Sequence, residues 1–330
     1  MKTLRGTHPD VLARATIGQR LSANTQLQHM VLVLKPSEEQ ENALVSLLDA
    51  QQDRNSGSFR KWLTPDTFAT GFGVAPSDIA QVSAWLSDSG LLVENVSRSG
   101  RFITFSGPVN ALETAFNTEM HNVTVDGEVH ISNTTDIAIP AALSPVVKGL
   151  ARLNNFFPKS GVADWKKVSM SASANGVSPD YGVNPAGTHY IGAADMATIY
   201  NSKPLTNAGT DGKGITISVI ARSNIQIADV QTYRSLFGLP QNDPEIIVVG
   251  QDPGQNSDDI EAYLDAEMAG SLASGATVKF IVSSASLVGE GIDTASLYAV
   301  DNNIGDIITM SYGGCEGRNG ASGTAFWNDL

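Results

Sequence analysis

The sequence predicts an α/β protein made of two parts, a smaller α+β part and a doubly wound parallel sheet. Between residues 29 and 156, strand and helix patterns follow the order β-α-α-β-β-α-β, which resembles a ferredoxin-like open sandwich with extra helices. From Gly214 onward, strand patterns alternate with helix patterns, which is typical of a parallel sheet. Residues 157–188 lie between these parts and are rich in Ser, Gly, Asn and Pro without periodicity, so we expect a linker there.

The first part opens with residues 1–28, which are polar and irregular and are expected to form a disordered lead-in. A short apolar run at 30–35 then predicts a strand. Ser37 followed by Gln40 has the spacing of a capping box, so a helix should begin there. Apolar spacing and turn residues predict the remaining elements, which are helices starting at 62–68 and 76–79, strands at 91–96 and 101–105, a helix at 109–116 and an extended segment at 121–125.

In the second part, the lengths of the apolar segments and the turn residues between them are typical of repeated strand–helix units. Strands are expected at 215–221, 245–249, 276–283 and 306–311, and helices at 225–237, 257–270 and 291–302. Chemistry in such sheets gathers at the carboxyl ends of the strands. Ser311, Tyr312, Gly313 and Gly314 follow the last strand, and the glycines would let a peptide lie close to the backbone.

The composition excludes several functions. The chain has 330 residues, 42% of them hydrophobic and 17% charged, which is typical of globular domains. The net charge of −13 and the pI near 4.7 argue against nucleic acid or an anionic membrane as partner, and they suit work in acid. No apolar run reaches the 18 residues of a membrane helix, and no signal peptide is visible at the N-terminus.

The helix expected at 257–270 carries the candidate chemistry. Ile260, Leu264 and Met268 are four residues apart and predict its buried face. Glu261 and Asp265 are also four apart, so both carboxylates should project from one side, about one turn from each other. In a partly closed site the two would share a proton, which is a usable acid/base device. The alternative is that the pair forms part of a solvated face.

Other common chemistries find no support in the sequence. There is no Walker motif, no zinc spacing and no nucleotide-type Gly-x-Gly-x-x-Gly after a strand, so we expect no metal site and no cofactor in this chain. Of the five histidines, none lies near a strand end of the second part. A Ser-His-Asp arrangement therefore has no obvious base.

A family resemblance connects these observations. From about residue 29 the chain resembles a sedolisin (serine-carboxyl peptidase) zymogen of kumamolisin-like type, with an activation propeptide at 29–156, a linker at 157–188 and the start of a subtilisin-like peptidase domain at 189–330. The motifs that carry the resemblance are Trp62-Leu63-Thr64-Pro65, Phe72-Gly73, Ala84-Trp85-Leu86, Phe105-Ser106-Gly107, Gly127-Glu128-Val129-His130, Ala197-Thr198-Ile199-Tyr200-Asn201, Glu261-x-x-Leu264-Asp265 and Ser311-Tyr312-Gly313-Gly314.

The resemblance implies a secreted endopeptidase that acts on proteins and peptides at acidic pH and is inhibited by its own propeptide. Glu261 matches the general base that serves a serine nucleophile, and Asp265 matches the residue that orients this base and shares its proton. The segment from Ser311 to Gly314 matches the strand that holds the substrate backbone in extended form. The family also implies a calcium site near the end of the complete domain.

The family's nucleophile motif, Ser-Gly-Thr-Ser, and its oxyanion motif, Gly-Asp-Ser-Gly, do not occur in the sequence. We therefore expect a truncated catalytic domain that is inactive alone, or else a non-catalytic propeptide-like remnant that acts as a binding protein or inhibitor. Ser322, in Gly320-Ala321-Ser322-Gly323-Thr324-Ala325, resembles the nucleophile motif but is expected to be a decoy in a loop before a helix. The resemblance implies that Cys315, the single cysteine, pairs with a later cysteine outside this chain, and the alternative is a free buried thiol.

We predict that maturation of the complete enzyme cuts within residues 157–188, because exposed aperiodic segments are preferred sites of proteolysis. N-terminal sequencing of the acid-activated protein checks this. A new N-terminus before Asn155 or after Tyr200 would contradict it.

Overall fold

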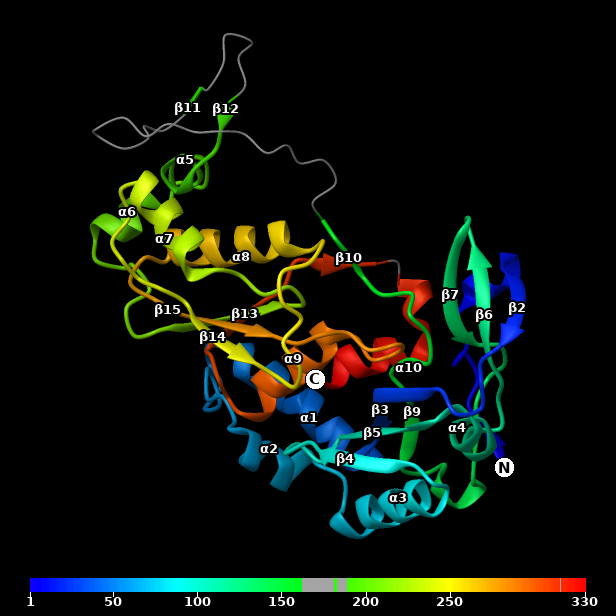
Figure 1. The fold of residues 1–330 in the computed structure, drawn as a ribbon. Coiled ribbons are helices and arrows are strands. Elements are labelled where there is room, and N and C mark those ends of the chain that lie inside the picture. Colours follow the sequence, from blue (N-terminus) through cyan, green and yellow to red (C-terminus); the bar gives the residue numbers. More distant parts are fainter. Residues whose placement is uncertain (162–180, 183–188, 315) are drawn as a thin grey trace. The chain divides into compact units, whose positions relative to one another are not determined.

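The computed structural model describes residues 1–161, 181–182, 189–314 and 316–330 of a mixed α/β protein (Figure 1). The described residues form two compact units. Unit 1 consists of Met1–Pro158, Ala285–Asn303 and Gly314–Leu330, and unit 2 consists of Lys159–Ser284 and Ile304–Gly313. Most of the predicted linker 157–188 and Cys315 lie outside the described residues, so the maturation segment and the fate of the thiol stay predictions.

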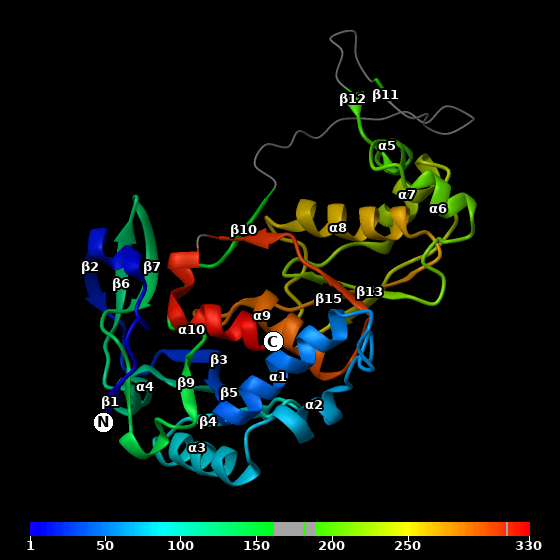
Figure 2. The same ribbon diagram turned by 180° about the vertical axis from the view of Figure 1, so that it is seen from behind.

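The main sheet of unit 1 is antiparallel, with the order β4-β5-β3-β9. Its strands are β3 (Gln26–Leu34), β4 (Leu92–Val96), β5 (Phe102–Pro108) and β9 (Val147–Leu150). Because side chains alternate along a strand, β3 presents Met30 and Leu32 to one core and Val31 and Val33 to another. The sheet is therefore buried on both faces, with α3 on one side and α10 on the other (Figures 1 and 2).

The first two helices of unit 1 begin where the sequence supplies capping boxes. Helix α1 (Glu38–Gln52) starts with the predicted capping box, in which the Ser37 hydroxyl accepts the Gln40 amide and the Gln40 side chain accepts the Ser37 amide. Helix α2 (Pro65–Phe72) has a similar box at Thr64. The remaining helices of the N-terminal region are α3 (Pro76–Asp88), α4 (Val109–Phe116) and the 3₁₀ turns η1 (Asp10–Arg14) and η2 (Ala141–Leu143).

Two sequence predictions for this unit are wrong. The segment at 121–125 does not join the main sheet, because β6 (Met120–Val125) pairs with β2 (Thr16–Arg20) and β7 (Glu128–Asn133) in a second sheet. Residues 1–28 are not an irregular lead-in. They contain η1 and β2, and β1 (Lys2–Thr3) pairs with β8 (Ala138–Ile139). Both errors involve β1 and β2, which gain order from partners distant in the sequence rather than from local periodicity.

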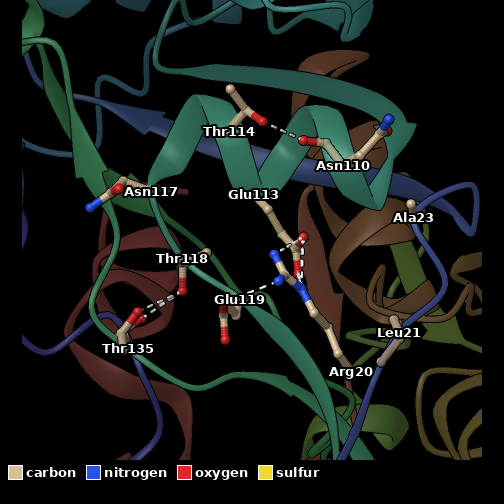
Figure 3. Close-up of a pocket in the computed structure, with 10 residues that line it drawn as sticks. All are labelled: Arg20, Leu21, Ala23, Asn110, Glu113, Thr114, Asn117, Thr118, Glu119 and Thr135. Atoms are coloured by element: carbon tan, nitrogen blue, oxygen red, sulfur yellow. Dashed lines mark hydrogen bonds and ion pairs between the residues drawn. The ribbon is translucent and has the colours of Figure 1, made fainter.

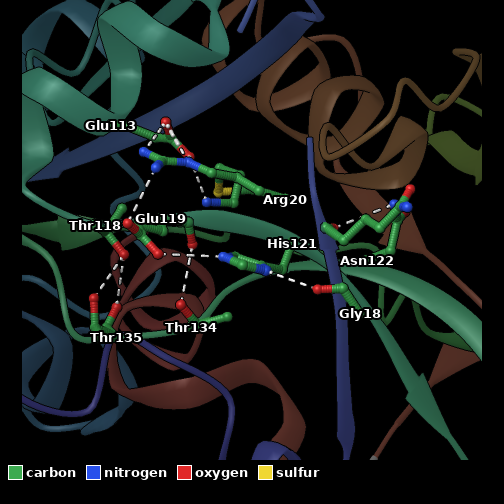
Figure 4. A network of polar contacts seen from close by, with 11 residues as sticks. Gly18, Arg20, Glu113, Thr118, Glu119, His121, Asn122, Thr134 and Thr135 are labelled. Carbon is green, nitrogen blue, oxygen red and sulfur yellow. Dashed lines mark hydrogen bonds and ion pairs between the residues drawn. The ribbon is translucent and has the colours of Figure 1, made fainter. Parts of the chain in front are cut away.

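An ionic network fastens β2 to α4 inside unit 1 (Figures 3 and 4). The Arg20 guanidinium donates to both carboxylate oxygens of Glu113, at 2.6 Å for the shortest contact, and lies 3.1 Å from Glu119. Glu113 also accepts the Met120 amide. Burial opposes ionisation of Glu113, but these donors outweigh it and lower the pKa of the carboxyl. The network lines a pocket of about 590 Å³, which Arg20 enters from β2 (Figure 3).

Two helices from the end of the chain complete unit 1. They are α9 (Gly291–Asp301) and α10 (Glu316–Asp329), which is interrupted at Gly320. Leu297 of α9 and Phe326 of α10 pack against Val33 and Phe102 of the main sheet. The side chains of Arg152 and Asp293, each at most 6% exposed, form a buried ion pair at 2.9 Å. The described units thus divide the predicted 189–330 domain, whose boundaries stay predictions.

Unit 2 is built on a wholly parallel sheet with the order β14-β15-β13-β16. The strands are β13 (Thr216–Ala221), β14 (Glu245–Val248), β15 (Thr277–Val282) and β16 (Ile307–Thr309). The helices are α5 (Ala193–Ile199), α6 (Lys203–Asn207), α7 (Ile227–Leu236) and α8 (Asp259–Leu272), and the short strands are β10 (Lys159–Ser160), β11 (Tyr181–Gly182), β12 (His189–Tyr190) and β17 (Tyr312–Gly313). Strand β13 comes first in the sequence but lies inside the sheet, with later strands on both sides of it, so the sheet is doubly wound.

An ion pair holds a bulge in β3 of unit 1. His29 has a left-handed backbone, with φ of 58°, and its amide donates to the Ser106 hydroxyl. Its Nδ1 lies 2.9 Å from Glu94 on β4, and Ser106 also hydrogen-bonds Glu94. The bond to Glu94 raises the pKa of His29 against the opposing effect of burial. Burial opposes ionisation of Glu94, but the bonds from His29 and Ser106 lower its pKa overall.

We predict that this pair contributes most to stability between about pH 4.5 and 6.5. Because the pKa of His29 is raised in the folded protein, protonated His29 stabilises the fold fully below pH 6.5. This contribution is lost as the pH rises through the pKa of His29 in the folded protein. Because the pKa of Glu94 is lowered in the folded protein, ionised Glu94 stabilises the fold above pH 4.5. This contribution is lost as the pH falls through the pKa of Glu94 in the folded protein. A double-mutant cycle with Glu94→Gln and His29→Asn, followed by thermal unfolding, should give a coupling that peaks in this window. A coupling independent of pH would contradict the prediction.

Candidate active site

Helix α8 is buried through small residues, and this places one of its carboxylates inside the protein. Ala262 and Ala266 pack into the core formed with β13 and β15, while Glu261 is only 3% exposed. The predicted buried face of Ile260, Leu264 and Met268 is wrong, because Leu264 is 46% exposed and the other two are half-buried. Small side chains let the helix approach the sheet closely, so alanines rather than large apolar residues face the strands.

Both predicted carboxylates are hydrogen-bonded to serine hydroxyls within unit 2. The Ser311 hydroxyl donates to Asp265 at 2.7 Å, and the Ser160 hydroxyl donates to Glu261. Burial raises the pKa of Asp265, and the charge of nearby Glu261 raises it further, against the opposing bond from Ser311. A carboxyl group with a raised pKa can hold a proton and pass it to its neighbour.

The predicted peptide-binding segment already pairs with a strand of this chain. In β17, Tyr312 is opposite Ser160 and Gly313 is opposite Lys159, in an antiparallel register with β10. Strand β17 thus accepts an extended backbone at the same place where Ser160 reaches Glu261. Among the predicted site residues, unit 2 contains Glu261, Asp265, Ser311, Tyr312 and Gly313, whereas Gly314 belongs to unit 1.

The site lies where the order of the parallel strands reverses. Strand β13 has β15 on one side and β16 on the other, so the carboxyl ends of β13 and β16 form a topological switch point. Ser311 follows β16 by two residues, and Arg222 directly follows β13. Nε of Arg222 donates to Asp258 at 2.7 Å, and its guanidinium lies 4.8 Å from the centre of the Tyr312 ring.

The structure also describes the predicted decoy. Gly320 breaks α10 with a φ of 67°, so Ser322 lies in the first turn of the following helical segment rather than in the loop before it. Ser322 is 5% exposed, and a Cβ added to Gly149 of β9 would collide with its hydroxyl. A hydroxyl packed this tightly against a strand has no space for a substrate.

Sequence reasoning missed Ser160 and Arg222. Ser160 falls in a stretch without periodicity, and its partner Glu261 is 101 residues away, so no local signal could have found it. Arg222 carried a signal, because it directly follows an interior strand of a parallel sheet.

Within the described residues, no group of three or more His, Cys, Asp or Glu side chains is arranged to hold a metal ion. None of the helices in the described ranges is both long and apolar enough to span a bilayer.

Comparison with known proteins identifies relatives that match most of the chain. Residues 13–156 match the family described as Pro-kumamolisin, activation domain. The chain is 25% identical to sedolisin of Pseudomonas sp. (strain 101), covering 96% of this chain and 53% of that protein. It is 26% identical to xanthomonalisin of Xanthomonas sp. (strain T-22), covering 87% and 35%, and 23% identical to kumamolisin of Bacillus sp. (strain MN-32), covering 78% and 46%. The chain thus spans about half or less of the length of these curated relatives.

The fold and the comparisons together define an activation domain followed by sequence related to peptidases. Residues 13–156 thus correspond to a Pro-kumamolisin activation domain, and the similarity to sedolisin, xanthomonalisin and kumamolisin supports the organisation of a sedolisin-family, kumamolisin-like zymogen.

A further carboxyl group on α8 makes the stability of unit 2 depend on pH. Burial, assisted by the charge of Asp229, raises the pKa of Glu267 from 4.5 to about 8. The folded protein therefore keeps a proton that the unfolded chain releases between these values, and stability falls as the pH rises through that range.

We predict that Glu267→Gln flattens this dependence, because an amide cannot ionise. The wild-type free energy of unfolding should fall by up to about 1.4 kcal/mol per pH unit between pH 5 and 8, and the variant should be the more stable protein at pH 8. Urea unfolding across this range measures it. Glu39→Gln, which changes an exposed carboxylate, is the control, and equal slopes in all three proteins would refute the prediction.

Proposed function

We propose that this chain is part of a serine-type endopeptidase zymogen that cleaves proteins and peptides at acidic pH through a Ser-Glu-Asp mechanism. The observation that carries the proposal is the hydrogen bond from the Ser160 hydroxyl to Glu261, beside the Asp265 carboxyl with its raised pKa. A carboxylate that accepts a serine hydroxyl is placed as a general base requires.

In the proposed mechanism, Glu261 takes the proton of the serine nucleophile as its oxygen attacks the peptide carbonyl. Asp265 shares the proton and holds the base in place, and Ser311 orients Asp265 through its hydroxyl. Glu261 then returns the proton to the leaving amine. A carboxylate base needs a medium in which its neighbour is still protonated, so the optimum is expected to be acidic.

The same geometry supports inhibition by the uncleaved chain, through the linker that follows the propeptide. Strand β10 occupies β17 in the antiparallel pairing that an extended substrate would use, and its Ser160 engages the proposed base. Ser160 thus stands where the hydroxyl of the nucleophile would stand. A substrate can reach β17 and Glu261 only after residues 159–160 have left.

Finer structural assignments also belong to this proposal. The antiparallel sheet β4-β5-β3-β9, with α1–α3 after its first strand and α4 after its third, supports a ferredoxin-like propeptide. The doubly wound parallel sheet of unit 2 supports the first part of a subtilisin-like domain.

Other parts of the proposal rest on the family alone. The family implies a serine nucleophile and a calcium site, both in parts of the protein outside this chain. It also implies that the protein is secreted. No step of the proposed mechanism is routed through a metal ion.

We predict that Glu261→Gln in the whole protein lowers kcat by about 10²–10⁴, because an amide cannot accept the serine proton. Hydrolysis of a fluorogenic peptide library at acidic pH measures this, and thermal unfolding confirms that the variant folds. Activity within about tenfold of wild type would show that Glu261 is not the base.

Ser322→Ala is the matched control for this experiment. It should leave turnover by the whole protein unchanged, since Ser322 is buried against Gly149, and the 330-residue chain alone should show no turnover. Turnover by this chain that disappears in Ser322→Ala would make Ser322 the nucleophile.

A further inference from the structure

Arg222 joins three pieces of the proposed site. It directly follows the interior strand β13, and its side chain is 13% exposed. Its Nε donates to Asp258, the N-cap residue of α8, three positions before Glu261. Its guanidinium lies against the ring of Tyr312, which is 6% exposed and belongs to β17. The one side chain thus contacts both the helix that carries the carboxylates and the strand that pairs with β10.

The backbone around Arg222 is fixed as well. The Asn256 side chain donates to the Arg222 carbonyl at 2.9 Å, and the Asn256 amide donates to the Ser223 hydroxyl at 3.1 Å. These bonds attach the loop before α8 to the end of β13. Arg222 is therefore held at its backbone as well as at Asp258, so its guanidinium presents a rigid surface to the Tyr312 ring.

The partners of Arg222 indicate what it does. Asp258 pairs with the guanidinium, so little uncompensated positive charge acts on the neighbouring carboxyls. The raised pKa of Asp265 is explained by burial and by Glu261, with Ser311 in opposition. In contrast, a guanidinium stacked on a buried ring restrains the ring in a defined plane. The geometry therefore favours a role of Arg222 in restraining β17 over a role in shifting the pKa values of the carboxyl groups.

We infer that Arg222 is a positioning residue for the substrate, which fixes β17 relative to the start of α8 so that an extended peptide on β17 lies beside Glu261. This inference rests on the proposed function for its substrate. Its structural content, that Arg222 restrains β17, can be tested independently of activity.

The first experiment follows amide hydrogen exchange in this 330-residue protein. Arg222→Met keeps the length of the side chain but removes its charge and planar group. Exchange at Tyr312 and Gly313 should become at least tenfold faster, while β13 and β15 keep their protection. Arg222→Lys should give an intermediate rate, because it can pair with Asp258 but cannot stack through a planar group. Lys213→Met, at an exposed position, should match wild type.

The second experiment measures peptide hydrolysis by the whole protein. Arg222→Met should raise KM about tenfold with kcat within about threefold, because a loosened strand loses substrate binding rather than the chemical step. The pKa of the acidic limb of kcat should stay unchanged, and Arg222→Lys should restore part of the affinity.

The outcomes separate the two claims. Unchanged exchange at Tyr312 and Gly313 in Arg222→Met overturns the inference, whatever the activity. Loss of protection throughout unit 2 also overturns it, because Arg222 would then act on the fold as a whole. A shifted acidic limb with KM unchanged would make Arg222 an electrostatic residue instead. The proposed function fails if the wild-type protein shows no turnover, or if Glu261→Gln does not remove its turnover. In that case the hydrogen-exchange result still decides the role of Arg222.

Discussion

The close approach of α8 to the parallel sheet is the constraint on which the site depends. Ala262 and Ala266 are small enough to bring the helix down onto β13 and β15, and Glu261, adjacent to Ala262, is buried with them. A buried carboxylate without partners would cost several kcal/mol, so its surroundings must supply donors. Ser160 supplies one for Glu261, and Ser311 supplies one for the neighbouring Asp265. Strands β10 and β17, which carry or adjoin these serines, are thereby drawn toward the helix.

The chain topology explains why these groups meet although they are far apart in the sequence. In a parallel sheet, each crossover returns the chain to the same edge, so strand ends separated by many residues become neighbours. Arg222 and Ser311 follow adjacent strands in this way. Helix α8 leads into β15, and its N-terminal half carries Glu261 and Asp265. The fold therefore gathers an acid pair, an arginine and a strand at one edge without any local motif.

Local signals in the sequence predicted local structure well. The capping box at Ser37, the apolar periods of α3 and α4, and the strands of unit 2 appear close to the expected positions, because each depends on neighbours within a few residues. Strands β2 and β9 were missed because their order comes from partners distant in sequence, whereas β7 was missed although it forms a hairpin with β6. The buried face of α8 was misassigned for a related reason. The periodic pattern was assigned from large apolar residues, whereas alanines form the helix face that packs against the sheet.

The site was only partly predictable. Glu261 and Asp265 could be paired from their spacing, but whether that pair faced water or protein depended on the sheet. Ser160 and the pairing of β10 with β17 depended on residues that carry no pattern of their own.

The pairing of β10 with β17 is only two residues long, and this has a consequence for its strength. Each net hydrogen bond in water contributes about 0.5–1.5 kcal/mol, so a free dipeptide would bind such a strand with a dissociation constant of about millimolar or weaker. The segment remains in place because the chain attaches it to its site, which raises its effective concentration without any additional contact. Occupancy of β17 therefore depends on the continuity of the backbone rather than on affinity. One broken peptide bond beside β10 would change this occupancy more than the loss of any single side chain within it.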